Sequence, residues 1–180
     1  MIQAANLTIL ICEIVGMVFI ILLGCALHFT YVWSRRHPLV GIFSAVNESI
    51  WEHLKMAFWP SLLYMTAEYG LISNWSTNFF FSKITGILTM IILIPTIFYS
   101  YTTLTKRNIL AIDICTFVVA VIVGQLVSFT LLTYEVLPQI FDALGLAAVI
   151  LLAAAFAIFT FYPPHLPIFE DSVTDNYGIT

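Results

Sequence analysis

The chain has 180 residues, of which 61% are hydrophobic and 9% are charged, and its net charge is −4. A soluble domain contains about a quarter charged residues, so this composition excludes a soluble globular domain and a disordered chain and indicates a multi-span membrane protein in contact with lipid. Six Lys and Arg residues cannot form a basic surface for a phosphate backbone, so no nucleic acid partner is expected.

Five apolar segments are long enough for a bilayer, which requires about 20 residues per helix. In chain order they cover residues 7–33, 56–73, 84–104, 109–134 and 143–162. The connections between them are short. The sequence therefore predicts an all-α bundle of about five transmembrane helices over residues 1–162, followed by a short C-terminal tail over 163–180. Cys12, Cys25 and Cys115 fall in apolar runs without metal or disulfide spacing, and we interpret them as small buried hydrophobic residues.

The distribution of cations predicts the orientation. Between the first two segments and between the third and fourth lie Arg35, Arg36, Lys55, Lys106 and Arg107, whereas Lys83 lies on the other side. Cytoplasmic loops carry an excess of Lys and Arg. We therefore expect a multi-pass protein of the cell (inner or plasma) membrane, with the N-terminus outside and the C-terminal tail in the cytoplasm.

The most polar stretch, residues 47–55, reads Asn-Glu-Ser-Ile-Trp-Glu-His-Leu-Lys and leads into the second segment. Asn47 is a suitable N-cap, and Glu48 would complement the positive end of the helix dipole. One interpretation is a solvated first helical turn with a Glu52–Lys55 ion pair. The other is a cytoplasm-facing site that binds a cation or moves a proton. The candidate residues of that site are Asn47, Glu48, Ser49, Glu52, His53 and Lys55, with His28 and Asp113 from neighbouring segments.

Polar residues within the spans fall into two layers. His28, His53 and Asp113 lie near the cytoplasmic helix ends and are expected to approach one another, whereas Glu13, Glu68 and Gln125 form an outer polar layer. Intramembrane charges usually face the bundle interior and mark function. His28, His53, Glu52 and Asp113 would be the ligands of a metal ion, but no fixed-spacing motif unites them, so no metal is assigned and the cofactor stays unknown.

A family resemblance adds to these patterns. The 47–55 motif, the stretches 27–29, 39–46 and 58–60, and the tail motif 163–171 resemble a family of small prokaryotic multi-span membrane proteins of unknown function. The resemblance covers essentially the whole chain. The family usually has proline where this chain has Ser172 and glycine where it has Asp175. The resemblance implies the topology and favours a docked tail, with Ile168, Phe169 and Tyr177 against the bundle and Glu170 and Asp171 near the cations, but it names no reaction.

Three function classes remain open. The first is a small solute, ion or proton-coupled transporter, which the separation of the two polar layers slightly favours; so small a bundle would then act as a homo-oligomer. The second is a membrane-embedded enzyme acting on a lipid or isoprenoid, with Glu48, Glu52, His53 and Asp113 as acid/base or metal groups. The third is a non-catalytic membrane subunit whose polar groups fix helix packing.

Overall fold

The computed structural model describes residues 2–134 and 137–179 and confirms the all-α fold. Of the described residues, 79% are helical, and no strand occurs among them. The α-helices are α1 (Ile2–Trp33), α2 (Pro38–Gly41), α3 (Ile50–Ile72), α4 (Phe79–Thr105), α5 (Leu110–Tyr134) and α6 (Gln139–Phe161). Two 3-10 turns, η1 (Ser73–Trp75) and η2 (Pro167–Phe169), complete the elements. The short helix α2 was not predicted.

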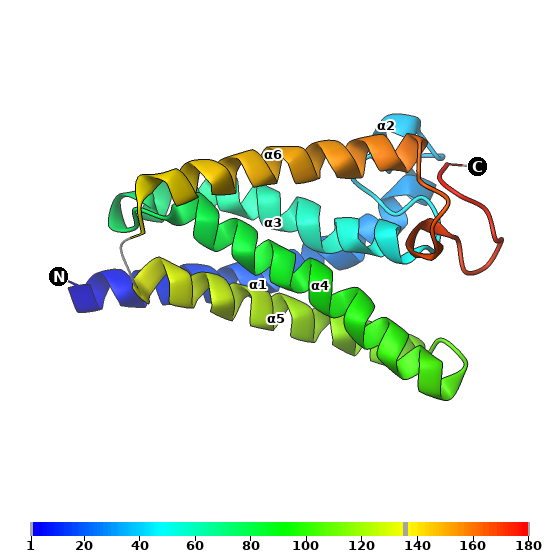
Figure 1. The fold of residues 1–180 in the computed structure, drawn as a ribbon, viewed down its shortest axis with the longest axis horizontal. Helices are drawn as coiled ribbons and strands as arrows, with labels where there is room; N and C mark the ends of the chain where they lie inside the picture. Colours follow the sequence, from blue (N-terminus) through cyan, green and yellow to red (C-terminus); the bar gives the residue numbers. More distant parts are fainter. Residues whose placement is uncertain (1, 135–136, 180) are drawn as a thin grey trace.

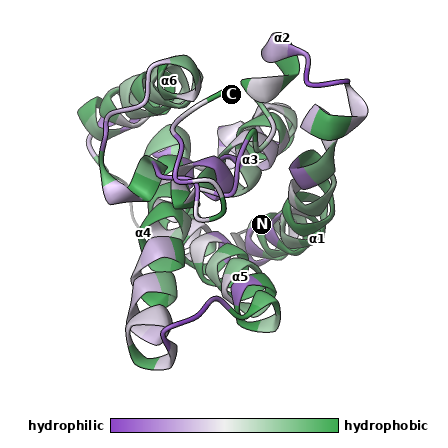
Figure 2. Cartoon of the chain, turned by 90° about the vertical axis from the view of Figure 1, so that its right-hand side faces the viewer, coloured by the Kyte–Doolittle hydropathy of each residue, from purple (hydrophilic) through white to green (hydrophobic). Residues whose placement is uncertain are grey.

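The five long helices run along one axis as an up-and-down bundle (Figure 1). At one end, here called the N-terminal end, lie the start of α1, the α3–α4 connection, the end of α5 and the start of α6. The other end, the C-terminal end, holds α2, the α4–α5 connection and the tail. Viewed from the C-terminal end, the outer helices are mainly hydrophobic, and hydrophilic segments gather in the connections (Figure 2). The helices α1, α4, α5 and α6 are each long and apolar enough to cross a membrane.

Helix α3 is the least apolar of the five long helices and carries three charged residues. Over 23 residues it carries Glu52, Lys55 and Glu68, and all three side chains are buried. Helix α3 is not among the helices that are apolar enough to span, although it packs against α1 and α4 inside the bundle. Four of the five predicted spans are thus long apolar helices, and the fifth span stays a prediction.

Helices α4 and α5 pack closely because glycine faces glycine. A Cβ atom on Gly86 would lie 2.6 Å from the carbonyl oxygen of Gly124, and a Cβ on Gly124 would lie 2.6 Å from that of Gly86. Small residues of this kind allow close approach of membrane helices. The contact lies one turn beyond Lys83 and brings Ser128 toward the bundle interior.

Two of the six cations that were counted between the predicted spans are buried helix residues. Lys55 and Lys83 lie inside α3 and α4, and both are buried. The exposed cations Arg35, Arg36, Lys106 and Arg107 all lie in the α1–α2 and α4–α5 connections, at the C-terminal end. All exposed Lys and Arg residues therefore lie at one end of the bundle, whereas the sequence count places five of six cations on one side.

The interpretation of the cysteines as buried was also wrong. Cys25 and Cys115 are exposed on the surface of the bundle and Cys12 is half-buried, and all three thiols are free. An exposed thiol on an apolar helix face is compatible with contact to lipid, because a small hydrophobic side chain can be covered by lipid as well as by protein.

The tail folds back onto the start of α3. The ring of Phe169 is buried, with its centroid 4.7 Å from that of Trp51, and Asn47 Nδ2 donates to the carbonyl oxygen of Gly178 at 3.0 Å. Asp171 accepts hydrogen bonds from within the tail, namely from Val173 N and Thr174 Oγ1. It therefore caps a turn, and no ion pair joins Asp171 to an arginine or lysine in the described part of the chain.

Asp175 has a left-handed backbone, with φ +57°. Glycine adopts this region without steric cost. The resembled family has glycine at this position, and the left-handed backbone of the turn explains that preference.

Candidate functional site

The start of α3 differs from the prediction that Asn47 caps it. Ser49 is the N-cap and accepts from Glu52 N at 3.3 Å, whereas Asn47 Oδ1 accepts from Ser49 N and forms a turn before the helix. Because the helix begins at Ile50, Glu48 lies outside its regular winding. Glu48 therefore does not share a helix face with Glu52 and is free to turn toward His53.

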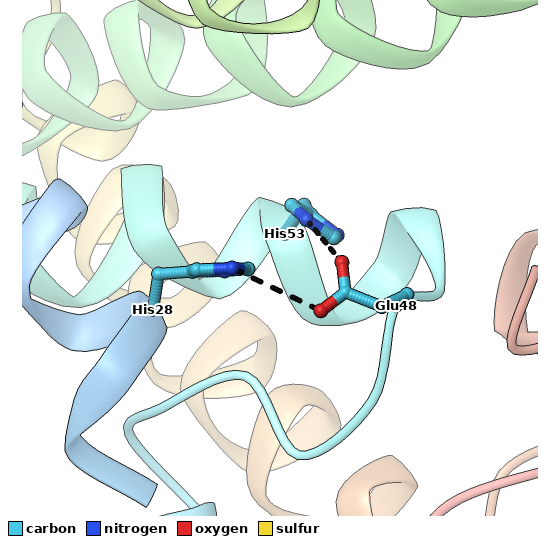
Figure 3. A group of neighbouring side chains, drawn as sticks. All are labelled: His28, Glu48 and His53. Atoms are coloured by element: carbon cyan, nitrogen blue, oxygen red, sulfur yellow. Dashed lines mark ion pairs between the residues drawn. The ribbon is translucent and has the colours of Figure 1, made fainter. Parts of the chain in front are cut away.

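Three side chains, here called the His–Glu–His cluster, meet at this point: His28 from α1, Glu48 from the connection and His53 from α3 (Figure 3). Glu48 Oε1 lies 3.8 Å from His28 Nε2, and Glu48 Oε2 lies 3.4 Å from His53 Nε2. The imidazole centroids are 5.4 Å apart. The histidines are half-buried and Glu48 is exposed, so the cluster is accessible.

The hydrogen bonds of His53 define its chemistry. Its Nδ1 lies 2.8 Å from the carbonyl oxygen of Ser49, which can only accept, so Nδ1 carries a proton. His53 Nε2 then faces the carboxylate of Glu48 in one of two forms. It is protonated, so that His53 is an imidazolium, or it carries a lone pair, and a cation must then lie between the two groups. A backbone carbonyl that fixes the tautomer in this way is typical of metal-binding histidines.

The electrostatics of Glu48 favour its charged form. The hydrogen bond from His53 holds the pKa of the Glu48 carboxyl below its ordinary value, and the positive charge that His53 and His28 can carry acts in the same direction, against partial desolvation. Glu48 is therefore a carboxylate at neutral pH, as a metal ligand or an imidazolium partner must be.

The cluster lies at the polar end of a cavity of about 480 Å³. The cavity is lined mainly by apolar side chains of α1, α3, α4 and α5, among them Cys25, Phe29, Met56, Ile94, Phe98, Leu110, Ile114 and Phe117. Phe29, Leu110 and Ile114 are exposed, so the cavity opens on the side of the bundle. Asp113 lines the same cavity from α5, and its Oδ1 accepts a hydrogen bond from the hydroxyl of Tyr101.

Glu52 and Lys55 form a separate, buried pair. Their charged atoms are 2.5 Å apart, and the side chains are 2% and 0% exposed. Lys55 Nζ also donates to Gly41 O at 2.7 Å and to Thr160 Oγ1 at 2.9 Å. The predicted i, i+3 pair is present, but it is not solvated. It joins α2, α3 and α6, and neither residue lines the cavity.

The outer polar residues gather in a second buried group, here called the Lys83 cluster: Lys83, Glu13 and Glu68. Lys83 Nζ lies 2.7 Å from Glu13 Oε1 and 2.5 Å from Glu68 Oε2. From α5, Ser128 Oγ donates to Glu13 Oε1 at 2.8 Å and Gln125 Nε2 donates to the backbone oxygen of Glu13 at 3.4 Å. Four helices therefore converge on this cluster.

The structure thus places most of the predicted site residues in three groups, whereas Asp113 contacts Tyr101 outside the His–Glu–His cluster and Asn47 and Ser49 hold the start of α3. It also adds residues that the sequence did not single out. Lys83 is the most important addition. A signal for it exists in the sequence, because two glutamates inside spans need a cation and Lys83 stands at the start of an apolar run. Tyr101 and the apolar cavity wall carry no such signal.

Comparison with protein-family models matches residues 4–179 to a family described as "Family of unknown function (DUF6512)". No curated protein and no solved structure matches the chain in the corresponding searches. The match extends over all three polar groups, the cavity and nearly the whole tail. The chain belongs to the DUF6512 family of unknown function.

Proposed function

We propose that this protein is a membrane-embedded, metal-dependent hydrolase that acts on an amphipathic substrate. The observation that carries the proposal is the position of the His–Glu–His cluster at the polar end of an apolar cavity. The four long apolar helices agree with an integral membrane protein.

The donor set suits a catalytic divalent ion. His28, Glu48 and His53 each offer one ligand atom, and these atoms lie within 4.8 Å of one another. Two histidines and one carboxylate with an open fourth position form a known type of catalytic zinc site. Bonds of about 2.1 Å place tetrahedral ligands roughly 3.4 Å apart, so His28 has to move toward the other two when the ion binds.

The cavity supports a substrate with an apolar tail and a polar head. Its walls accept hydrocarbon, and its opening between exposed apolar side chains admits a molecule from the bilayer. A divalent ion held by His28, Glu48 and His53 would supply a Lewis acid and an activated water for the hydrolysis of an ester. Asp113, which lines the same cavity, would act as the general base that takes a proton from the attacking water and then returns it to the leaving alcohol.

Zinc titration of the purified, chelator-treated protein tests the metal site. We expect one Zn²⁺ per chain, and at least a tenfold lower affinity in His53→Ala and in Glu48→Gln. His37→Ala is the matched control, because His37 is exposed in the α1–α2 connection and lies outside the cluster. Equal zinc affinity in the wild type and His53→Ala would remove the metal site and favour a non-catalytic membrane subunit.

A long-chain p-nitrophenyl ester tests the chemistry of the zinc-loaded protein. Asp113→Asn should retain zinc binding and lose about 10²–10⁴-fold in hydrolysis rate, the usual contribution of a general base. Hydrolysis that is unchanged in Asp113→Asn would assign the base elsewhere. Absence of hydrolysis in a wild type that binds zinc would overturn the enzymatic proposal.

The proposed topology has five spans in the cell membrane, with the C-terminal end in the cytoplasm. The four exposed cations at that end support it. A cysteine placed at residue 37 should resist an impermeant reagent added from outside. Labelling at that position from outside would reverse the orientation.

Transport is the second candidate, and the Lys83 cluster favours it, because buried charges within a bundle often mark ion or proton paths. The cavity, however, includes no residue of that cluster. Proton uptake into liposomes containing the protein, lost in Glu68→Gln but kept in His53→Ala, would favour transport over hydrolysis. A homo-oligomer belongs to this second candidate.

A further inference from the structure

The charges of the Lys83 cluster do not balance if every group is ionised. Glu13, Glu68 and Lys83 are 0%, 1% and 4% exposed, and one ammonium lies between two carboxyl groups. Full ionisation would leave one negative charge buried among four helices. A charge without a partner in such surroundings costs so much free energy that the group takes up a proton instead.

The neighbouring groups do not supply a second positive charge. Helix α3 contributes Tyr64, whose hydroxyl donates to the backbone oxygen of Cys12 at 2.6 Å and so does not reach the carboxyl groups. Helix α1 adds the Cys12 thiol, and α5 adds the neutral side chains Gln125 and Ser128. In the described part of the chain, Lys83 is the one cation paired with either glutamate.

Two carboxyl oxygens provide places for the proton. Glu13 Oε2 and Glu68 Oε1 are buried, and neither has a hydrogen-bond partner among the described residues. Their sister oxygens, Glu13 Oε1 and Glu68 Oε2, contact the same nitrogen of Lys83. Both carboxyl groups are therefore held within one charge cluster, where each affects the ionisation of the other.

We propose that Glu13 and Glu68 bind one exchangeable proton between them, so that the Lys83 cluster is a neutral proton-binding site. The site is separate from the cavity, and the inference does not depend on the metal or on hydrolysis. Glu68 lies four residues before the end of α3, which corresponds to about 6 Å along the helix axis. The N-terminal end is therefore the nearer end of the bundle for exchange of this proton.

Infrared spectroscopy of the carboxyl C=O stretch tests the proposal, because a protonated carboxyl group absorbs apart from a carboxylate. At pH 7 the wild type should give a protonated-carboxyl signal that either Glu13→Gln or Glu68→Gln removes. Each single change suffices, since the remaining glutamate and Lys83 form a neutral ion pair. Lys83→Met should instead double the signal, because both carboxyl groups then bind protons.

Asp175→Asn is the matched control, because Asp175 is an exposed carboxyl in the tail, and it should leave the signal unchanged. A signal that survives both glutamine variants, or that is absent from the wild type at pH 7, would overturn the proposal. If a substituted chain does not fold, the wild type still decides. Raising the pH should convert one buried carboxyl group per chain to carboxylate, and no such conversion would contradict the site.

Discussion

The His–Glu–His cluster and the Lys83 cluster both combine carboxyl groups with basic nitrogen atoms, but they differ in their access to solvent and ligands. The first is half-exposed, borders a cavity and holds histidine nitrogens that face a carboxylate. The second is sealed among four helices, with a lysine already at its centre. An accessible cluster with free ligand positions can accept an ion and a substrate. A sealed cluster with its own cation can exchange only a proton.

The comparison also separates stability from function. Removing one partner of a buried ion pair leaves an uncompensated charge, whereas an exposed pair contributes little to stability. We therefore expect substitutions in the Lys83 cluster to affect folding and substitutions in the His–Glu–His cluster to affect binding. The four predictions below test this difference, from the largest expected change in free energy of unfolding to the smallest.

Lys83→Met should have the largest effect. The change removes the partner of both Glu13 and Glu68, and we expect a loss of about 3–5 kcal/mol in the free energy of unfolding. Protonation of the second glutamate would reduce this loss at low pH. Unfolding in SDS titrations at pH 5 and pH 8 would measure both, and equal stability of the wild type and the variant would show that the cluster does not stabilise the fold.

Glu52→Gln should destabilise the protein by about 3 kcal/mol, because it leaves Lys55 charged in a fully buried position. The sequence interpretation of an exposed pair implied a loss of only about 0.5 kcal/mol. Zinc affinity should change little, since Glu52 does not line the cavity. A variant that folds normally but binds no zinc would instead place Glu52 in the site.

Gly86→Ala should cost about 1–3 kcal/mol, because the added Cβ meets the backbone of α5 at 2.6 Å and lies 3.1 Å from the Cβ of Ser128. Separation of α4 and α5 also draws Ser128 away from Glu13. Gly70→Ala is the control, since a Cβ on Gly70 has no neighbour within 4 Å. Similar melting temperatures for the two variants would contradict the close helix contact.

His28→Ala should have the smallest effect on stability, less than about 1 kcal/mol, because the His28–Glu48 pair is partly exposed and 3.8 Å apart. The same variant should lose zinc affinity at least tenfold. Thermal unfolding with and without Zn²⁺ would measure both quantities. A large loss of stability without zinc would mean that the cluster is a structural contact.

Much of the fold follows from hydropathy alone. The helices α1, α4, α5 and α6 are long apolar runs, so their positions required no tertiary information. Helix α3 was harder to delimit, because its first two turns contain Glu52 and Lys55. In the sequence these charges indicate a solvated helix start, and only the structure shows that contacts with α2 and α6 bury them.

The site required the structure for a different reason. Glu48 and Glu52 look equivalent in the sequence, but the start of α3 at Ile50 directs them to different partners. Lys83 resembles a loop cation until Glu13 and Glu68 are seen to face it. The spacing of residues in the sequence predicts which side chains share a face of one helix. The polar groups described here form between several helices, so their partners cannot be read from that spacing.

The hydrogen bond from Asn47 to Gly178 has a consequence for biogenesis. These residues are 131 positions apart in the chain. At a synthesis rate of about 5–20 residues per second, the ribosome completes Gly178 roughly 7–26 s after Asn47. During that interval the loop carrying Glu48 lacks the contact that the tail supplies. The final arrangement of this loop therefore follows the synthesis of every long helix in the chain.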